Sequence, residues 1–402
     1  MTRSLSIVGG VYRERCIHPQ WNAVYGSAGR AAQCVTSLIG EPVRLLTYVA
    51  DEIRDEVIYL ANDCGAELIA SHASHEICFD YLHPLSTPII SPSVQRIVQH
   101  SPIRVADDVV LRFGMLEGDA VIGAKIAVYD PQSAFGATHF SMNGSRAENL
   151  AVVMNRSEAF SMTGESDPDV AASKLIKDGS ATVVIVKMGS QGAFVMTPTV
   201  KSMVPFYRTD RVWKIGSGDV FSATFSALWG CSGFDPIEAA DLASRATAAY
   251  CETRTLPAPA LEFLRSMSNS SSTQKTGTVY LAGPFFDLAQ RWLIEEARDI
   301  LFSLGASVFS PIHDVGSGAA NVVASADIEG LEKSDVIFAI ANGLDAGTIF
   351  EIGYAVKLKK PVVVLAQNIK EEDLKMIVGS GCEVVDDFTS ALYRAVGRLP
   401  NL

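Results

Sequence analysis

Residues 335–366 read DVIFAIANGLDAGTIFEIGYAVKLKKPVVVLA. In this stretch a helical segment, 347–360, lies between two apolar runs, 335–341 and 361–366. Short apolar runs bounded by turn residues are typical of buried strands, and two strands joined through a helix pair in parallel. The stretch therefore predicts a parallel β-sheet covered by helices.

The same alternation extends in both directions along the chain. Before this stretch, in the same half of the chain, we expect a strand at 278–283, a helix at 291–305 and a strand at 306–311. Further towards the N-terminus, apolar runs predict buried strands at 4–10, 43–50, 120–130 and 181–189, and an Ala-rich stretch predicts a helix at 237–252. Between the two halves, the Ser-rich polar segment 266–276 is typical of a linker. The sequence thus predicts an α/β protein with domains at 1–265 and 277–402.

Composition narrows the class of protein. The chain has 402 residues, of which 48% are hydrophobic and 19% charged, as in a well-packed globular protein. Its net charge of −12 argues against a nucleic-acid-binding surface, although a small phosphorylated ligand can still be bound locally. No apolar stretch reaches the roughly 18 residues of a membrane span. Seven cysteines without a CxxC pair predict reduced thiols and a cytoplasmic location.

The first candidate site lies in KIGSGDVFSATFSALWG, residues 214–230. Gly216, Ser217 and Gly218 form a flexible turn before an apolar helix, whose N-terminus attracts anions such as phosphate. Asp219 at the start of this helix can take a proton from an attacking hydroxyl group. A plain loop with a capping aspartate would read the same way when taken alone.

This passage resembles the Gly-Ala-Gly-Asp signature of the ribokinase-like (PfkB) carbohydrate and nucleoside kinases. The resemblance covers about residues 1–265 and implies an α/β sandwich that phosphorylates a sugar or nucleoside hydroxyl with ATP and Mg²⁺, with Asp219 as the base. It implies sugar contacts for Glu14, Gly26 and Gly29. It implies nucleotide or phosphate contacts for Gly216, Ser217, Gly218, Asn155, Glu158, Gly189 and Gly192, with Mg²⁺ held through water by Asn155 and Glu158.

Two departures from the family pattern leave a second interpretation open. Trp213, Lys214 and Ile215 replace the usual Asp-Thr-Thr, and Glu14 replaces an aspartate. The lost aspartate and hydroxyl groups alter the phosphate or ion site, whereas Lys214 can supply positive charge to a phosphate. The alternative is therefore a degenerate kinase domain that binds a nucleoside or nucleotide and regulates the other domain, or a non-catalytic nucleotide sensor.

The second candidate site combines three elements of the C-terminal half. They are YLAGPFF at Tyr280–Phe286, Asp327, and DAGTIFEIGY at Asp345–Tyr354. Cleavage of an N-glycosidic bond develops positive charge on the sugar, which an ionised carboxylate can stabilise or bond to. We expect Glu351 in the first helical turn to be this nucleophile, ionised by the helix dipole and held by Tyr354.

The remaining residues of these elements have expected roles at the base and the sugar. Asp345 and Asp327 are candidates to bind the leaving base and give it a proton. We expect the substrate to be contacted by Tyr280, Gly283, Phe285, Phe286 and Tyr354, the glycine by close backbone approach and an aromatic ring by stacking. The loop Gly316–Gly318 favours a phosphorylated substrate, but a plain flexible loop explains it equally well.

Together the three elements closely resemble the nucleoside 2-deoxyribosyltransferase family, over about residues 277–392. The resemblance implies a flavodoxin-like fold, no cofactor, active sites shared between subunits and hence a homo-oligomer (dimer or higher). Members of the family either exchange bases or hydrolyse nucleoside 5′-monophosphates. The joint interpretation is a two-step enzyme of nucleoside metabolism that acts on small-molecule substrates, with no nucleic-acid or membrane partner. The first domain phosphorylates a nucleoside, or the sugar of one, and the second cleaves the glycosidic bond of that product or transfers its sugar. A chain in which both domains only bind ligands is the remaining alternative.

Overall fold

The structure is a computed structural model that describes residues 3–267 and 275–401. The described chain forms two compact units. Unit 1 comprises the residues up to 267 except Asp210–Val212, and unit 2 comprises these three residues with 275–401. The linker predicted at 266–276 falls largely on 268–274, which lie outside the described residues.

Unit 1 is built on a nine-stranded sheet in the order β13-β12-β11-β10-β9-β8-β1-β4-β5. Neighbouring strands from β5 to β11 pair in parallel, and β12 and β13 continue the sheet in antiparallel fashion. The strands are β1 (Leu5–Val8), β4 (Arg44–Val49), β5 (Glu67–His72), β8 (Ile103–Phe113), β9 (Ala120–Asp130), β10 (Arg146–Asn155), β11 (Val183–Lys187), β12 (Ala193–Met196) and β13 (Lys201–Val204).

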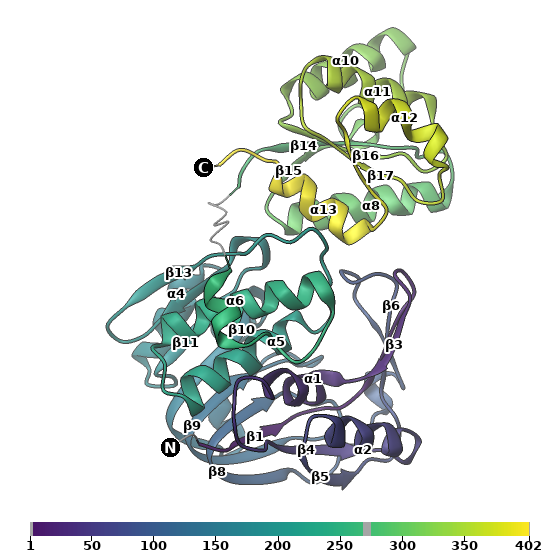
Figure 1. Cartoon of the computed structure of the whole chain (residues 1–402). Helices are drawn as coiled ribbons and strands as arrows, with labels where there is room; N and C mark the ends of the chain where they lie inside the picture. The colour runs from purple at the N-terminus through teal and green to yellow at the C-terminus, as the bar shows by residue number, and fades with distance from the viewer. Residues whose placement is uncertain (1–2, 268–274, 402) are drawn as a thin grey trace. The chain divides into compact units, whose positions relative to one another are not determined.

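Helices cover this sheet, and α1, α5 and α6 pack against one another (Figure 1). The helices of unit 1 are α1 (Gly26–Val35), α2 (Arg54–Asp63), α3 (Arg156–Thr163), α4 (Pro168–Lys177), α5 (Ser217–Phe225), α6 (Pro236–Thr253) and α7 (Leu261–Ser266). Short 3₁₀ turns occupy Asp51–Ile53, Val94–Arg96, Phe140–Asn143 and Gly189–Gln191, and a π-helical turn, Ser226–Cys231, continues α5. The small, buried alanines of α1 and α6 allow the close helix packing.

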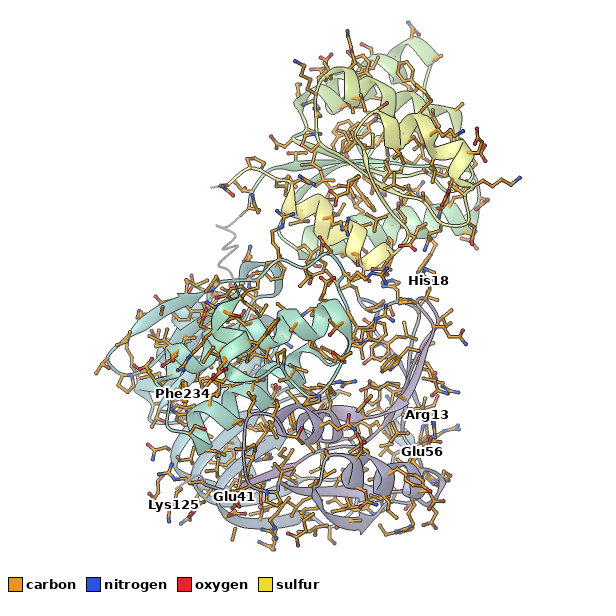
Figure 2. All side chains as sticks on the ribbon, in the orientation of Figure 1. Arg13, His18, Glu41, Glu56, Lys125 and Phe234 are labelled. Carbon is orange, nitrogen blue, oxygen red and sulfur yellow. The ribbon has the colours of Figure 1, made fainter. Side chains whose placement is uncertain are left out.

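A second, four-stranded sheet in unit 1 has the order β3-β2-β6-β7. Its strands are β2 (Arg13–Cys16), β3 (Trp21–Val24), β6 (Cys78–Tyr81) and β7 (Ile89–Ser91). A 2.7 Å salt bridge joins Arg13 of the inner strand β2 to Glu56 of α2, and both residues are labelled in Figure 2. The short strands of this sheet lack a long apolar run, so the sequence analysis did not predict it.

Unit 2 is a five-stranded, all-parallel sheet in the order β15-β14-β16-β17-β18. Counted along the chain this is the order 2-1-3-4-5, which defines the flavodoxin-like fold. Figure 1 shows α10, α11 and α12 on one face and α8 and α13 on the other. The strands are β14 (Thr278–Ala282), β15 (Ser307–Phe309), β16 (Val336–Ile340), β17 (Val362–Leu365) and β18 (Glu383–Val385). The helices are α8 (Leu288–Ser303), α9 (Pro311–Asp314), α10 (Ala320–Lys333), α11 (Ala346–Lys357), α12 (Glu371–Gly379) and α13 (Phe388–Gly397).

These elements confirm the predicted strands and helices of both halves, and the predicted α/β class. The antiparallel edge formed by β12 and β13 departs from the purely parallel sheet that the alternation predicted in unit 1. None of the seven cysteines, all of which lie in the described ranges, forms a disulfide, and six of them are buried. Within the described ranges, no helix combines the length and apolar character that crossing a membrane requires.

Candidate functional site

Unit 1 contains a cavity of about 420 Å³ between the four-stranded sheet and the N-termini of α1 and α5. Parts of the chain that are far apart in sequence meet here, because the ends of parallel strands lie at one edge of the sheet. Charged and polar groups come from Glu14, Ser27, Arg30, Thr87, Gln132, Ser133 and Asp219. Apolar and aromatic side chains form much of the remaining wall. The predicted residues Glu14, Gly26, Gly216, Gly218 and Asp219 all line the cavity, whereas Gly29 does not.

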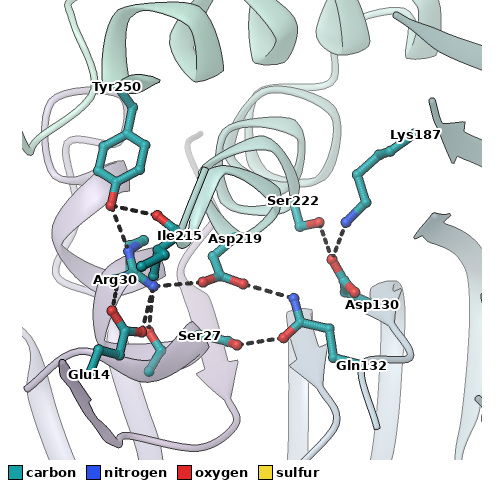
Figure 3. Close-up of polar contacts among 11 residues, drawn as sticks. Glu14, Ser27, Arg30, Asp130, Gln132, Lys187, Ile215, Asp219, Ser222 and Tyr250 are labelled. Atoms are coloured by element: carbon teal, nitrogen blue, oxygen red, sulfur yellow. Dashed lines mark hydrogen bonds and ion pairs between the residues drawn. The ribbon is translucent and has the colours of Figure 1, made fainter. Parts of the chain in front are cut away.

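A buried arginine joins the two predicted acidic residues of this cavity (Figure 3). Nη1 of Arg30 donates to Glu14 Oε1 at 3.0 Å and to Asp219 Oδ2 at 2.8 Å, and Nη2 donates to Glu14 Oε2. Its Nε donates to the hydroxyl of Tyr250 at 3.1 Å. Arg30 is only 1% exposed, so water contributes little to its solvation. Two carboxylates and one guanidinium therefore form a buried, hydrogen-bonded ion cluster.

This cluster fixes the electrostatics of the cavity. Burial disfavours the charge of Arg30, but Glu14, Tyr250 and Asp219 outweigh this and hold the pKa of the guanidinium above its usual value. Burial also raises the pKa of Glu14, although Arg30 opposes the shift. Oδ1 of Asp219 accepts a hydrogen bond from Nε2 of Gln132 at 2.8 Å. Both oxygens of Asp219 thus already accept hydrogen bonds from protein side chains.

Glycine at 216 makes this cluster sterically possible. Gly216 precedes α5 with a φ of 75°, in the left-handed region that side chains rarely adopt. A Cβ atom at this position would lie 2.1 Å from the guanidinium carbon of Arg30. The Gly-Ser-Gly turn therefore accommodates an arginine as well as presenting backbone N–H groups at the start of the helix.

Two lysines lie on the other side of this turn. Nζ of Lys187 donates to Asp130 Oδ2 at 2.7 Å, and Nζ of Lys214 donates to the hydroxyl of Ser217 at 3.1 Å. Burial lowers the pKa of Lys214, and the charge of Lys187 lowers it further. These cations and the N-terminus of α5 favour an anion at Ser217 and Gly218, as the sequence analysis expected for phosphate.

The predicted magnesium residues have a local structural role. Asn155 and Glu158 form a capping box at the start of α3: the Asn155 side chain accepts from the Glu158 N–H at 2.9 Å, and the Glu158 carboxylate accepts from the Asn155 N–H at 2.7 Å. Burial and the charge of Asp130 raise the pKa of Glu158 to about 7. Among the described residues, Oδ1 of buried Asp130 has no hydrogen-bond partner. These oxygens fit a hydrated Mg²⁺ bound through water, which would supply positive charge to the phosphates.

No group of three or more His, Cys, Asp or Glu side chains within 3–267 and 275–401 is arranged to hold a metal directly.

The predicted nucleotide residues Gly189 and Gly192 shape the connection between β11 and β12. A Cβ at Gly192 would lie 2.1 Å from the carbonyl oxygen of Val204, so glycine is required there by packing. Gly29 similarly lies against Leu60 of α2.

Unit 2 contains a smaller cavity of about 190 Å³ between β14, α10 and α11. It lies beside β14 and β16, the point at which the strand order reverses and where such sheets bind ligands. The cavity is lined by Tyr280, Ala324, Asp327, Ile328, Leu331, Gly347, Phe350, Glu351 and Tyr354. Four predicted residues, Tyr280, Asp327, Glu351 and Tyr354, are therefore brought together. The charged groups of this lining are the two carboxylates.

Glu351 lies in the second turn of α11, which begins at Ala346, rather than in its first turn. Its Oε1 accepts a hydrogen bond of 2.5 Å from the hydroxyl of Tyr280, whose ring is stacked on Phe309. Burial raises the pKa of Glu351 to about 7, with Asp327 and Asp345 adding to the shift and Tyr280 opposing it. The sequence analysis expected the helix dipole to favour the ionised carboxylate, but burial raises its pKa instead, because desolvation outweighs the dipole beyond the first turn.

Tyr354 does not hold Glu351, contrary to the sequence analysis. Its hydroxyl donates instead to Glu332 of α10 at 2.5 Å, and its ring stacks on Phe350. Residues three apart share a helix face, but the long tyrosine ring reaches across to the next helix. The hydrogen bond to Glu351 comes from β14, which adjoins the helix only in the folded chain.

The two aspartates differ in their surroundings. Oδ1 of Asp327 is buried and has no hydrogen-bond partner among the described residues, and burial raises the pKa of its carboxyl group. Asp345 caps α11 by accepting hydrogen bonds from the N–H of Thr348 at 2.9 Å and from its hydroxyl at 3.1 Å. Asp345 is not among the cavity-lining residues, so the structure places Asp327 nearer to the expected substrate.

Other predicted contacts lie outside this cavity lining. A Cβ at Gly283 would lie 2.8 Å from Ile294, so this glycine allows α8 to pack closely on the sheet. Phe286 is 71% exposed, and its ring contacts that of Phe285. The loop Gly316–Gly318 also contributes nothing to the lining.

Sequence reasoning missed Arg30, Gln132 and Lys187 as site residues. Arg30 directly follows Gly29, and Lys187 lies near the end of the strand predicted at 181–189, so position alone could have marked both as candidates. Their partners could not be found in this way, because Arg30 is separated from Asp219 by 189 positions and Lys187 from Asp130 by 57.

Comparisons with known proteins agree with this architecture. Residues 149–260 match the family model of the pfkB family carbohydrate kinases, and residues 279–388 match that of nucleoside 2-deoxyribosyltransferase. The chain is therefore a fusion of a PfkB-family kinase domain and a nucleoside 2-deoxyribosyltransferase-like domain. Both resemblances inferred from the sequence are confirmed. Kinases of the PfkB family are generally dependent on ATP and a metal.

One solved structure supports the fold of unit 1, and two others are similar to it. A protein from Agrobacterium tumefaciens, provisionally called a ribokinase, matches at a TM-score of 0.50 and 15% identity, covering 66% of this chain and 97% of its own. Ribokinase from Thermotoga maritima matches at 0.49 and 17%, covering 66% and 98%. Phosphofructokinase-2 from Escherichia coli in complex with potassium matches at 0.47 and 14%, covering 66% and 97%. A comparison with curated proteins finds no significant match.

Proposed function

We propose that this protein is an enzyme of nucleoside metabolism whose unit 2 cleaves the N-glycosidic bond with Glu351 as the nucleophile. The observation that carries this proposal is the contact of Glu351 with Tyr280 inside a cavity that also holds Asp327. We further propose the domain limits 1–265 and 277–402, joined by a linker at 266–276, and a homo-oligomer in the cytoplasm.

The proposed mechanism assigns a separate task to each carboxyl group. Ionised Glu351 attacks C1′ of the sugar, or stabilises the positive charge that develops there, as the C1′–N bond breaks. The hydrogen bond from Tyr280 orients this carboxylate. Asp327, whose pKa is raised by burial, remains protonated to higher pH than an exposed aspartate and gives its proton to the leaving base. Water or a second base then receives the sugar.

The charges of this cavity favour an uncharged substrate. Its charged lining groups, Asp327 and Glu351, are both acidic, and the other lining side chains are apolar or aromatic. A 5′-phosphate bound beside them would experience like-charge repulsion at low dielectric. We therefore propose that unit 2 acts on a nucleoside in preference to its 5′-monophosphate, so that base release does not require ATP.

For unit 1 we propose phosphorylation of a sugar or nucleoside hydroxyl. Asp219 would accept the proton of the acceptor hydroxyl, and the N-terminus of α5 with Lys214 would hold the transferred phosphate. ATP with Mg²⁺ would supply the phosphoryl group. Gln132 and Arg30, which contact the two oxygens of Asp219, would orient its carboxylate.

One observation favours a second candidate function for unit 1. Arg30 already occupies Asp219 and Glu14, so an acceptor hydroxyl has to approach carboxylates that are engaged in ion pairs. In this second proposal unit 1 binds a nucleoside or nucleotide without phosphoryl transfer and regulates unit 2.

Product analysis by mass spectrometry tests these proposals. The purified protein would be incubated with a panel of nucleosides, their 5′-monophosphates and free pentoses, with and without ATP and Mg²⁺. We expect free base from a nucleoside without ATP, and ADP when a suitable acceptor is present. Ligand binding by unit 1 without any ADP would instead support the regulatory function. Release of base from the 5′-monophosphates but not from the nucleosides would contradict the proposal that unit 2 prefers an uncharged substrate.

Replacement of Glu351 tests the nucleophile directly. Glu351→Ala should lower base release by roughly 10³-fold or more, since covalent and electrostatic stabilisation are lost together. The matched control is Glu329→Ala, which removes an exposed glutamate of α10 that pairs with Lys333 outside the cavity lining. Turnover that persists in Glu351→Ala, with the fold intact by circular dichroism, would disprove the assignment.

A further inference from the structure

The cavity of unit 1 has a broad apolar wall that phosphoryl transfer to a sugar alone does not explain. Phe79 of β6 and Ile90 of β7 are paired across the four-stranded sheet and both line the cavity. Tyr12 and Leu116 belong to a buried cluster against which Phe79 and Ile90 pack. The apolar and aromatic lining residues are Tyr12, Phe79, Tyr81, Pro88, Ile90, Met115, Leu116, Ala134 and Ile215.

The Tyr12 ring within this wall is held in place. Its hydroxyl donates to Oε2 of buried Glu117 at 2.6 Å and accepts from the N–H of Leu116 at 3.0 Å. The ring stacks on Phe79 with a centroid separation of 5.3 Å and an interplanar angle of 29°. Because both ends of the tyrosine are fixed, the wall offers a preorganised flat surface and loses little entropy when a ligand binds.

The chemistry of the two parts of the cavity restricts the ligand. A free pentose carries a hydroxyl group on most of its carbon atoms, and a hydroxyl that is buried against apolar side chains without a hydrogen-bond partner weakens binding. Glu14, Gln132 and Asp219 can satisfy hydroxyl groups at the polar end, whereas the side chains of Phe79, Ile90 and Leu116 carry no polar group. The volume of about 420 Å³ also lies within the range of about 300–1,000 Å³ typical of pockets for larger small molecules.

We propose that the cavity of unit 1 binds a nucleoside, with the sugar at Glu14, Asp219 and Gln132 and the base against the wall formed by Tyr12, Phe79 and Ile90. This proposal rests on the assignment of the cavity as the acceptor site of unit 1, with or without phosphoryl transfer. It implies that both units take the same class of molecule, so unit 1 acts on or senses a nucleoside whose glycosidic bond is intact.

Calorimetric titration of the full chain tests this proposal. Glu351→Gln serves as the background, so that nucleosides are not consumed, and no phosphoryl donor is added. The ligands are a nucleoside, the corresponding free pentose and the free base. We expect Ile90→Ala to weaken nucleoside binding at one site by roughly tenfold, since apolar contact with the base is lost. Pentose binding, which does not reach the wall, should stay unchanged.

The neighbouring Ile89→Ala is the matched control. Ile89 is on the same strand, but its side chain is 71% exposed and outside the cavity lining. Equal nucleoside affinities of the Ile89→Ala and Ile90→Ala proteins would overturn the proposal, as would a pentose that binds as tightly as the nucleoside. If Ile90→Ala fails to fold, Phe79→Leu supplies the same comparison. Failure of the proposed catalytic functions would be seen separately, as the absence of ADP formation or of base release by the wild-type protein. It would not change the nucleoside affinities measured by calorimetry.

Discussion

Unit 1 and unit 2 both place two carboxyl groups in a cavity, but they compensate the charges differently. In unit 1, Arg30 forms ion pairs with both Glu14 and Asp219. In unit 2, Glu351 receives one hydrogen bond from neutral Tyr280, and Oδ1 of Asp327 has no partner among the described residues. Burial alone would raise the proton affinity of acids in both places.

This difference separates two uses of a buried acid. Arg30 opposes the rise that burial causes in the pKa of Glu14, and it orients both acids through ion pairs, so that they are already engaged when a ligand arrives. In unit 2 the uncompensated burial brings Glu351 to a pKa of about 7, where ionised and protonated forms coexist near neutral pH. Such perturbed carboxyl groups in cavities are typical of functional sites. The comparison predicts that charge removal will have opposite effects on the stability of the two units.

The largest effect is expected from Arg30→Met. Without the guanidinium, Glu14 and Asp219 remain buried as uncompensated acids, and we expect the free energy of unfolding of unit 1 to fall by about 3–5 kcal/mol. Urea denaturation followed by the fluorescence of Trp213, which is buried in unit 1, measures this loss. The control is Lys125→Met, which breaks an exposed 2.8 Å ion pair with Asp108 and should change the free energy of unfolding little. Lys125 is labelled in Figure 2.

A second substitution sharpens this test. Adding Glu14→Gln to Arg30→Met removes one of the uncompensated acids and should recover part of the lost stability. Equal stability of wild type and Arg30→Met would contradict the view that this arginine compensates the buried acids.

In unit 2, removal of a buried charge is expected to increase the free energy of unfolding. The pKa of Glu351 is raised from 4.5 to about 7 by folding, so the native state binds the proton more tightly than the unfolded state. Stability from this group is fully present below about pH 4.5 and is lost as pH rises through about 7. Glu351→Gln avoids this loss and should exceed wild type in the free energy of unfolding by on the order of 3 kcal/mol at pH 8. Denaturation of both proteins at pH 4 and pH 8 measures the difference. Parallel pH curves would disagree with the raised pKa.

A smaller effect is expected from Tyr280→Phe. The hydrogen bond from Tyr280 lowers the pKa of Glu351, so its removal should raise this pKa further. Base release requires ionised Glu351, and the midpoint of its rise with pH should therefore move upward by about one unit. The measurement is the pH dependence of kcat/KM for base release.

Tyr354→Phe is the control for this shift. The Tyr354 hydroxyl donates to Glu332 and not to Glu351, so its removal should leave the midpoint in place. A shift caused by Tyr354→Phe but not by Tyr280→Phe would show that the sequence-based partner of Glu351 was right after all.

Local pattern explains how much of the two sites the sequence could predict. Asp219 and Glu351 were found because each lies in a short segment where a glycine-containing turn meets a helix. Tyr280 was expected to contact the substrate. Its hydrogen bond to Glu351 depends on the pairing of β14 with β16, the strand that lies between α10 and α11 along the chain. The ion cluster of Arg30 was not predicted, because its partners come from β2 and α5. No spacing rule connects such distant positions.

The sequence by itself determined the alternation of strands and helices, the division of the chain into two kinds of domain and the segments that carry the candidate acids. These properties follow from hydrophobic period and local turn chemistry, which act over a few neighbouring residues. Only the tertiary structure decided the state of those acids. Desolvation and ion pairing depend on which distant side chains surround a group. Arg30 therefore forms ion pairs with Glu14 and Asp219, whereas burial raises the pKa of Glu351 to about 7.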